Sequence, residues 1–221
     1  MVWEGGGREA APYPDLSAAR VYYNAGRSEE ALKAAEQGYR IAEADENLAV
    51  MRNLLWAKGL AYLGLGKTTE AQETADELKA LVEKSMNKKS IRLYQHLQAQ
   101  IDLENRNYER AIVNLKAALA LLLPQNPHSD YYDSLAKAYE GSGDLENARK
   151  TYEKMQAPIS GRFTTGNLYA LSFYRLGLIA EKQGDKARAR ENYQKFLEIW
   201  KDADPGLPEL ADAKKRLAAL S

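Results

Sequence analysis

The sequence has no cysteine and only two histidines among its 221 residues. Without cysteine, disulfide bonds, thiol catalysis and cysteine-ligated metal sites are excluded, and two histidines are few for a metal cluster. The 31 Lys and Arg balance the 31 Asp and Glu, so the chain lacks the basic excess of general nucleic-acid binders. The longest apolar run, residues 117–123, is too short to span a bilayer. We therefore expect neither cofactor, nucleic acid nor membrane insertion.

Residues that favour strands are also scarce. Val, Ile and Thr together number 18, whereas there are 34 Ala and 29 Leu. Ala and Leu are among the best helix formers, and β-branched residues prefer strands. The composition therefore predicts an all-α protein.

The sequence contains a repeat of about 40 residues. Five alanines that we use as anchors follow one another at spacings of 40, 40, 37 and 41, namely Ala31, Ala71, Ala111, Ala148 and Ala189. Five residues before them stand Gly26, Gly66, Arg106, Gly143 and Gly184, and nine before stand Tyr22, Tyr62, Asp102, Tyr139 and Ala180. Twelve before, the residue is always small: Ala19, Gly59, Ala99, Ala136 and Gly177.

These offsets have a mechanical interpretation. A glycine can take a positive φ and end one helix, so the anchor falls in the next helix. Small residues at the anchor and twelve positions before it allow the two helices to approach closely. Each repeat is then a helix, a tight turn and an antiparallel helix, and such hairpins must stack to bury their apolar faces.

The small residue, Tyr, Gly and Ala at these offsets resemble the tetratricopeptide repeat, whose usual period is about 34 residues. The resemblance covers about residues 12–201 and implies a right-handed α-solenoid. The third repeat departs from the pattern, with Asp102 and Arg106 in place of Tyr and Gly. Asn105 is the residue we expect to supply the left-handed turn there.

The pattern divides the chain as follows. Residues 1–12 are a flexible segment, five repeats cover about 13–46, 47–87, 88–124, 128–157 and 166–203, and 208–221 form a capping helix. The expected helices are 14–25, 28–45, 47–65, 68–86, 89–105, 107–123, 129–142, 144–156, 166–183, 185–202 and 208–220. Residues 169–220 are similar to terminal repeats of large bacterial signalling proteins, which implies a bacterial source and an excised or terminal module. The absence of a signal segment favours the cytoplasm.

Two features mimic catalytic or ligand-binding motifs. Residues 61–68 end in Gly66-Lys67-Thr68 and resemble a phosphate-binding loop, but such a loop needs a preceding strand. Here we expect a helix before Gly66 and a structural turn at Gly66. His96 and His128 lie in different repeats without a second ligand at helical spacing, so we expect no metal site and no enzyme.

The informative surface is the concave face that the first helices of such repeats line. Taking the residues at the same distances before each anchor alanine gives a stripe along one side of each first helix. Its members are Tyr13, Leu16, Arg20, Tyr23, Asn53, Trp56, Leu60, Leu63, Leu93, His96, Gln100, Leu103, Asp130, Asp133, Lys137, Glu140, Leu171, Tyr174, Leu178 and Glu181. An exposed apolar stripe indicates a partner. Alternatively, longer helices would close the groove and make these positions core. Helical spacing alone does not distinguish the two cases.

Two functions of different classes follow. The first is a non-enzymatic interaction module that holds a peptide or helix of a partner, or of a second copy, with Trp56, Tyr23, Leu60 and Tyr174 as anchors. The acidic fourth repeat would then attract a basic end of that ligand. The second is a ligand- or peptide-sensing regulatory domain of a larger bacterial signalling protein.

Overall fold

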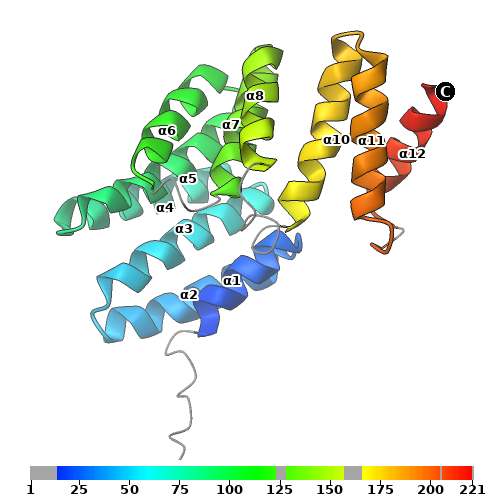
Figure 1. Ribbon diagram of the computed structural model, residues 1–221. Coiled ribbons are helices and arrows are strands. Elements are labelled where there is room, and N and C mark those ends of the chain that lie inside the picture. Colours follow the sequence, from blue (N-terminus) through cyan, green and yellow to red (C-terminus); the bar gives the residue numbers. More distant parts are fainter. Residues whose placement is uncertain (1–13, 123–127, 157–165, 205, 221) are drawn as a thin grey trace, which may run out of the picture. The chain divides into compact units, whose positions relative to one another are not determined.

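The computed structural model describes residues 14–122, 128–156, 166–204 and 206–220, and in these residues the chain is all-α without a strand (Figure 1). The helices are α1 (Pro14–Asn24), α2 (Ser28–Ala44), α3 (Leu48–Gly64), α4 (Thr68–Lys84), the 3-10 helix η1 (Lys88–Ser90), α5 (Ile91–Glu104), α6 (Tyr108–Ala120), α7 (Ser129–Ser142), α8 (Leu145–Gln156), α10 (Gly166–Lys182), α11 (Lys186–Ile199) and α12 (Pro208–Ala219). The expected helix ends agree with these within three residues.

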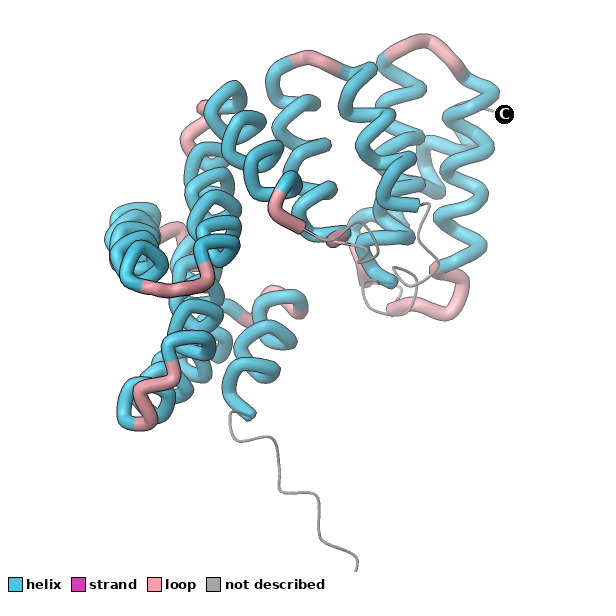
Figure 2. The backbone as a smooth tube through the Cα atoms, turned by 60° about the vertical axis from the view of Figure 1, so that its left-hand side comes forward, coloured by secondary structure: helices cyan, strands magenta, loops and turns pink. Residues whose placement is uncertain are grey.

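The chain divides into two compact units, residues 1–105 and 106–221, which we call unit 1 and unit 2. The division lies between α5 and α6 and therefore inside the third expected repeat. Residues 1–12, which we expected to form a flexible segment, lie outside the described residues. Within the hairpins α1–α2, α3–α4, α7–α8 and α10–α11, the two helices run antiparallel and are joined by short loops (Figure 2).

Unit 1 has one principal core. The first helices of successive hairpins pack side by side, α1 on α3 and α3 on α5. Between these and the second helices α2 and α4 lie Leu55, Leu78 and Leu97, all at most 1% exposed.

The described residues of unit 2 form two core clusters that join its last helices. Tyr152, Met155 and Ile179 lie in the core that joins α8 to α10. Tyr193 and Phe196 of α11 pack with Leu210 and Ala213 of α12 in the other. The C-terminal helix therefore covers apolar surface of the last hairpin, as a capping helix does.

The turn inside each hairpin is fixed by a residue in the left-handed region. Gly26, Gly66, Gly143 and Gly184 have φ angles of 71°, 70°, 84° and 77°. The next N–H closes the turn onto the carbonyl nine before the anchor, as from Lys67 to Tyr62 at 2.9 Å. This is the Schellman geometry, so the predicted role of these glycines is confirmed.

The prediction for the third turn was wrong. Asn105 has a φ of −82°, and Arg106 itself takes the left-handed conformation with a φ of 58°. In every hairpin the residue five before the anchor adopts the left-handed conformation. Arg106 does so although the conformation is strained for a residue with a side chain.

Small residues lie where the paired helices touch. All five anchors and the residues twelve before them are buried. A Cβ on Gly177 would lie 2.5 Å from the ring of Tyr193, and one on Gly59 would overlap the side chain of Leu97. Gly177 therefore allows close approach of α10 and α11 within one hairpin, and Gly59 allows close approach of α3 and α5, the first helices of successive hairpins.

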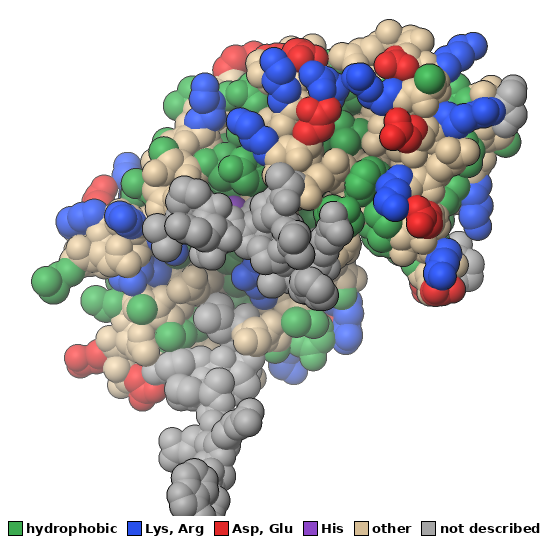
Figure 3. Space-filling model, in the orientation of Figure 1, with side chains coloured by type: hydrophobic (Ala, Val, Ile, Leu, Met, Phe, Trp, Pro, Cys, Tyr) green, Lys and Arg blue, Asp and Glu red, His purple; other side chains and the backbone are tan. Residues whose placement is uncertain are grey.

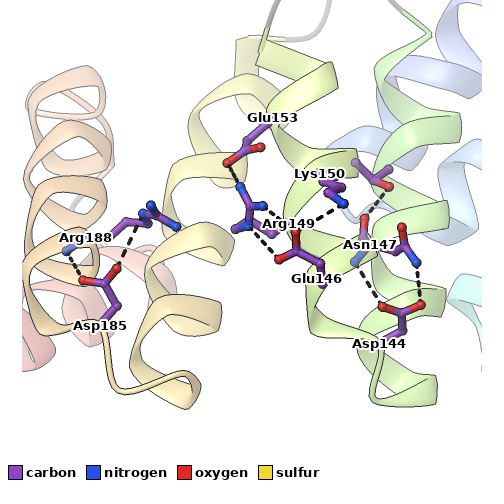
Figure 4. Close-up of polar contacts among 9 residues, drawn as sticks. Asp144, Glu146, Asn147, Arg149, Lys150, Glu153, Asp185 and Arg188 are labelled. Atoms are coloured by element: carbon purple, nitrogen blue, oxygen red, sulfur yellow. Dashed lines mark hydrogen bonds and ion pairs between the residues drawn. The ribbon is translucent and has the colours of Figure 1, made fainter.

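The second helices α8 and α11 of unit 2 begin differently from those of unit 1, whereas α6, which follows Asn107, begins without a side-chain capping bond. In unit 2 the carboxylates of Asp144 and Asp185 accept the N–H groups of Asn147 and Arg188, at 3.1 and 3.0 Å (Figure 4). In unit 1 the corresponding residues, Arg27 and Lys67, make no such capping bond.

The surface of α8 carries a set of ion pairs. Arg149 joins Glu146 and Glu153 at 2.7 and 2.5 Å. The hydrogen bond from Arg149 is the main reason that the pKa of Glu146 falls to about 2.

Candidate functional site

The predicted stripe does not lie uniformly on the surface. Tyr13 and the side chain of Leu16 fall outside the described residues. Trp56, Leu60 and His96 are 9%, 2% and 2% exposed in unit 1, and Asp133 and Tyr174 are 8% and 9% exposed in unit 2. Tyr23, Asn53, Leu63, Gln100 and Leu178 are half-buried, and Lys137 is exposed.

Trp56 and His96 form a polar contact inside the core of unit 1. The indole Nε1 of Trp56 donates to Nδ1 of His96 at 3.0 Å, and the ring centroids are 5.7 Å apart. Indole nitrogen can only donate, so Nδ1 of His96 accepts and carries no proton. Gln100 lies 3.3 Å from the other ring nitrogen. The anchor role expected for Trp56 and Leu60 is not supported by this burial, which makes them core residues.

The remaining half-buried and exposed positions of unit 1 lie along one side of its first helices. We call this set the first-helix face; it consists of Arg20, Tyr23, Asn53, Leu63, Gln100 and Leu103. Because α1 packs on α3 and α3 on α5, Tyr23, Leu63 and Leu103, each eight before an anchor, follow one another across unit 1. The structure thus retains a partly apolar row beside the buried Trp56.

In unit 2 the acidic positions already hold partners. Asp133 pairs with Lys137 at 2.7 Å. Glu140 accepts the hydroxyl of Tyr152 at 2.8 Å and lies 3.9 Å from Lys182. A basic ligand at this place would have to compete with these contacts.

The stripe of the last repeat packs against α12. Tyr174 donates its hydroxyl to Asp212 at 2.7 Å, and Glu181 accepts from Tyr193 at 2.6 Å and from Arg216 at 2.7 Å. Leu171 and Leu178 join the same core as Leu210 of α12. Asp212 and Arg216 were missed by the sequence analysis, although their spacing of four on one helix signals a paired face.

Burial and carboxylate partners keep the tyrosines protonated. Burial, with hydrogen bonds to Glu77 and Asp212, raises the pKa of Tyr39 and of Tyr174 to about 12. Burial likewise raises the pKa of Tyr152 and Tyr193. These phenols therefore act as neutral donors that connect helices, not as acid–base groups.

The sequence motifs that mimic catalytic sites have structural roles. Residues 61–64 are helical and Gly66 is the turn residue between α3 and α4, as predicted. His96 and His128 belong to different units, and no cluster of three metal-ligating side chains occurs among the described residues.

None of the described helices combines the length and apolar composition that a membrane span requires. On the face drawn in Figure 3, basic and acidic side chains are interspersed.

Comparisons with known proteins agree with this arrangement. Models of the tetratricopeptide repeat match residues 96–162 and 171–203. No curated protein sequence matches. Among solved structures, a thermophilic tetratricopeptide-repeat protein of Thermus thermophilus has a TM-score of 0.69 at 17% identity and covers 94% of this chain and 100% of its own.

Two further structures have the same fold. BtubC from P. vanneervenii has a TM-score of 0.68 at 15% identity, covering 96% of this chain and 84% of its own. MamA from Desulfovibrio magneticus RS-1 has a TM-score of 0.54 at 20% identity, covering 88% and 99%. The class is thus an all-α protein of repeated helical hairpins. Within this class, residues 96–162 and 171–203 are identified as tetratricopeptide repeats by their match to the family models.

Proposed function

We propose that this chain is a non-enzymatic interaction module, and that the first-helix face of unit 1 binds a peptide or a helix of a partner protein. The observation that carries the proposal is the row of Tyr23, Leu63 and Leu103, which remains half-buried while the residues beneath it are core. Aromatic and aliphatic side chains in such a position bury area at little cost in conformational entropy.

The core residues next to this row favour a binding surface of fixed shape. Trp56 is held by His96, and Leu60 and Leu97 fill the space around them in the same core. A preorganised surface loses less conformational entropy when it binds.

The test compares two substitutions of the same chemistry. Leu63→Glu places a charge in the row, and Val21→Glu places one on α1 where the side chain is already 63% exposed. Proteins that co-purify with tagged wild type are quantified by mass spectrometry, and the strongest is then titrated against each variant. We expect Leu63→Glu to weaken binding about tenfold or more, as at a hot spot, and Val21→Glu to leave it unchanged.

Tyr23→Ser serves as a second variant, and thermal unfolding confirms that each variant folds. Sedimentation velocity tests a second copy as the occupant, because Leu63→Glu would then also abolish self-association. Equal retention of every partner by wild type and by both folded row variants would overturn the proposal.

A further inference from the structure

Arg52, in the second turn of α3, is buried without a counter-charge among the described residues. It is only 7% exposed. Its Nη1 donates to Oγ of Ser85 at 2.6 Å, and Ser85 also accepts the backbone N–H of Asn87 at 3.1 Å. Nε of Arg52 is buried and has no hydrogen-bond partner in the part of the chain that the structure describes. One edge of the guanidinium is therefore left without an acceptor from those residues.

The surroundings of Arg52 are basic. Residues 83–93, from the end of α4 to the start of α5, contain Lys84, Lys88, Lys89 and Arg92 but only Glu83 as an acid. Arg92 is close enough to lower the pKa of Arg52, after the larger effect of burial. Arg92 and Lys88 donate to backbone carbonyls, of Lys89 at 3.0 Å and of Glu83 at 2.8 Å. Among the described residues, no ion pair joins Arg52, Arg92, Lys88 or Lys89 to a carboxylate.

This arrangement is costly in the absence of an anion. A buried charge is normally paired, because its lost hydration must be replaced. Arginine cannot avoid the cost by deprotonation. The hydrogen bond to the neutral Ser85 orients the guanidinium but supplies no compensating charge.

We propose that Arg52 and Arg92 bind an oxyanion of the phosphate class, with Ser85 orienting the guanidinium of Arg52 and with Lys88 and Lys89 at the rim. A guanidinium presents parallel donors that match two oxygens of a phosphate. The hydroxyl of Ser85 holds Nη1, so the edge that carries Nε is the one left for the ligand. The site lies at the α4–α5 connection and does not depend on the first-helix face.

Two sources would offer the same group: free inorganic phosphate, and a phosphorylated side chain of a protein. Calorimetric titration of the full chain with sodium phosphate, against sodium chloride at equal ionic strength, measures the first. A short phosphoserine peptide, with its unphosphorylated form as the blank, measures the second. Tighter binding of the phosphopeptide identifies a phosphorylated partner, whereas tighter binding of phosphate identifies the free ion.

Three variants locate the site. Arg52→Met keeps the aliphatic length and removes the charge, Arg92→Gln removes the neighbouring charge, and Arg40→Gln removes an equal charge from the exposed side of α2. We expect Arg52→Met to abolish binding, Arg92→Gln to weaken it about tenfold, equivalent to one charge-assisted contact, and Arg40→Gln to leave it unchanged.

Thermal unfolding gives a second readout. Phosphate should raise the Tm of wild type, because it binds only the folded state, and should not raise that of Arg52→Met. If Arg52→Met does not fold, Arg92→Gln decides by its loss of affinity. Absence of saturable binding to wild type, or equal binding by Arg92→Gln and Arg40→Gln, would overturn the site.

Discussion

The two units fill the same repeat positions with different chemistry. Four residues after the anchor, unit 1 has Ala35 and Ala75, while unit 2 has Leu115 in the third repeat and Tyr152 and Tyr193 in the last two. Eight residues before the anchor, unit 1 has Tyr23 and Leu63, while unit 2 has Glu140 and Glu181. In unit 2 these residues are joined by Tyr–Glu hydrogen bonds of 2.8 and 2.6 Å.

The difference shows which positions define the fold and which are variable. The buried small residues and the left-handed turn are common to both units. The position eight before the anchor is not fixed by the hairpin, so it is available for function. In unit 1 it presents a half-buried apolar row, and in unit 2 its carboxylates are already used in the fold.

The largest expected effect concerns glycines at close helix contacts, within a hairpin at Gly177 and between successive hairpins at Gly59. Gly177→Leu should lower the free energy of unfolding by about 1–3 kcal/mol or more, since overpacking at a tight contact cannot relax easily. Gly177 faces the ring of the buried Tyr193, whereas Gly59 faces the terminal methyl groups of Leu97. Gly59→Leu should therefore cost less, because a leucine side chain can rotate and a ring in a core cannot move as freely. Urea denaturation followed by circular dichroism measures both.

Lys67→Ala is the control for this pair, because Lys67 is exposed and surface substitutions usually stay within about 0.5 kcal/mol. A urea midpoint that falls further for Lys67→Ala than for Gly177→Leu would show that the contact positions are misassigned.

An intermediate effect is expected at the Tyr–Glu pairs. Tyr152→Phe should cost about 1.5–2 kcal/mol, in the lower part of the range for a hydrogen bond to a charged group. Among the described residues, Glu140 would then retain only its ionic contact with Lys182, at 3.9 Å. Tyr193→Phe should cost less, because Glu181 keeps Arg216 at 2.7 Å. Thermal unfolding at neutral pH tests the order, and an equal or larger loss for Tyr193→Phe would remove the role assigned to the ionic partner.

Local structure could be predicted from the sequence because it depends on local rules. The glycines five before the anchors end helices wherever they occur, and Pro208 begins α12 as predicted. Alanine and glycine mark the contact positions. These features need no knowledge of how one hairpin stacks on the next.

The exposure of the stripe could not be predicted in this way. Trp56 and Leu63 are seven residues apart and lie on the same helical stripe, yet one is core and the other is half-buried. Which side of the stripe is covered depends on the offset between stacked hairpins. A signal existed in retrospect: Trp56 and His96 occupy the same repeat position, 40 residues apart, and are hydrogen-bonded. Comparison of equivalent positions in successive repeats would have suggested this pair.

The smallest expected effect concerns the turn inside the third hairpin. There Arg106 stands where the other four hairpins have glycine. Arg106 has a φ of 58°, where a side chain costs energy that glycine does not. Arg106→Gly should therefore raise the free energy of unfolding by up to about 1 kcal/mol, after part of the gain is offset by the greater freedom of glycine in the unfolded chain.

Asn105→Gly is the matched variant for this turn. The φ of Asn105 is −82°, which any residue adopts, so glycine there brings only its entropic cost. We expect this variant to lower stability by about 0.5–1 kcal/mol. Both midpoints are measured in the same urea series, with wild type in each run. If Asn105→Gly stabilises and Arg106→Gly does not, the left-handed residue in solution is Asn105, and the third hairpin turns one residue earlier than the other four.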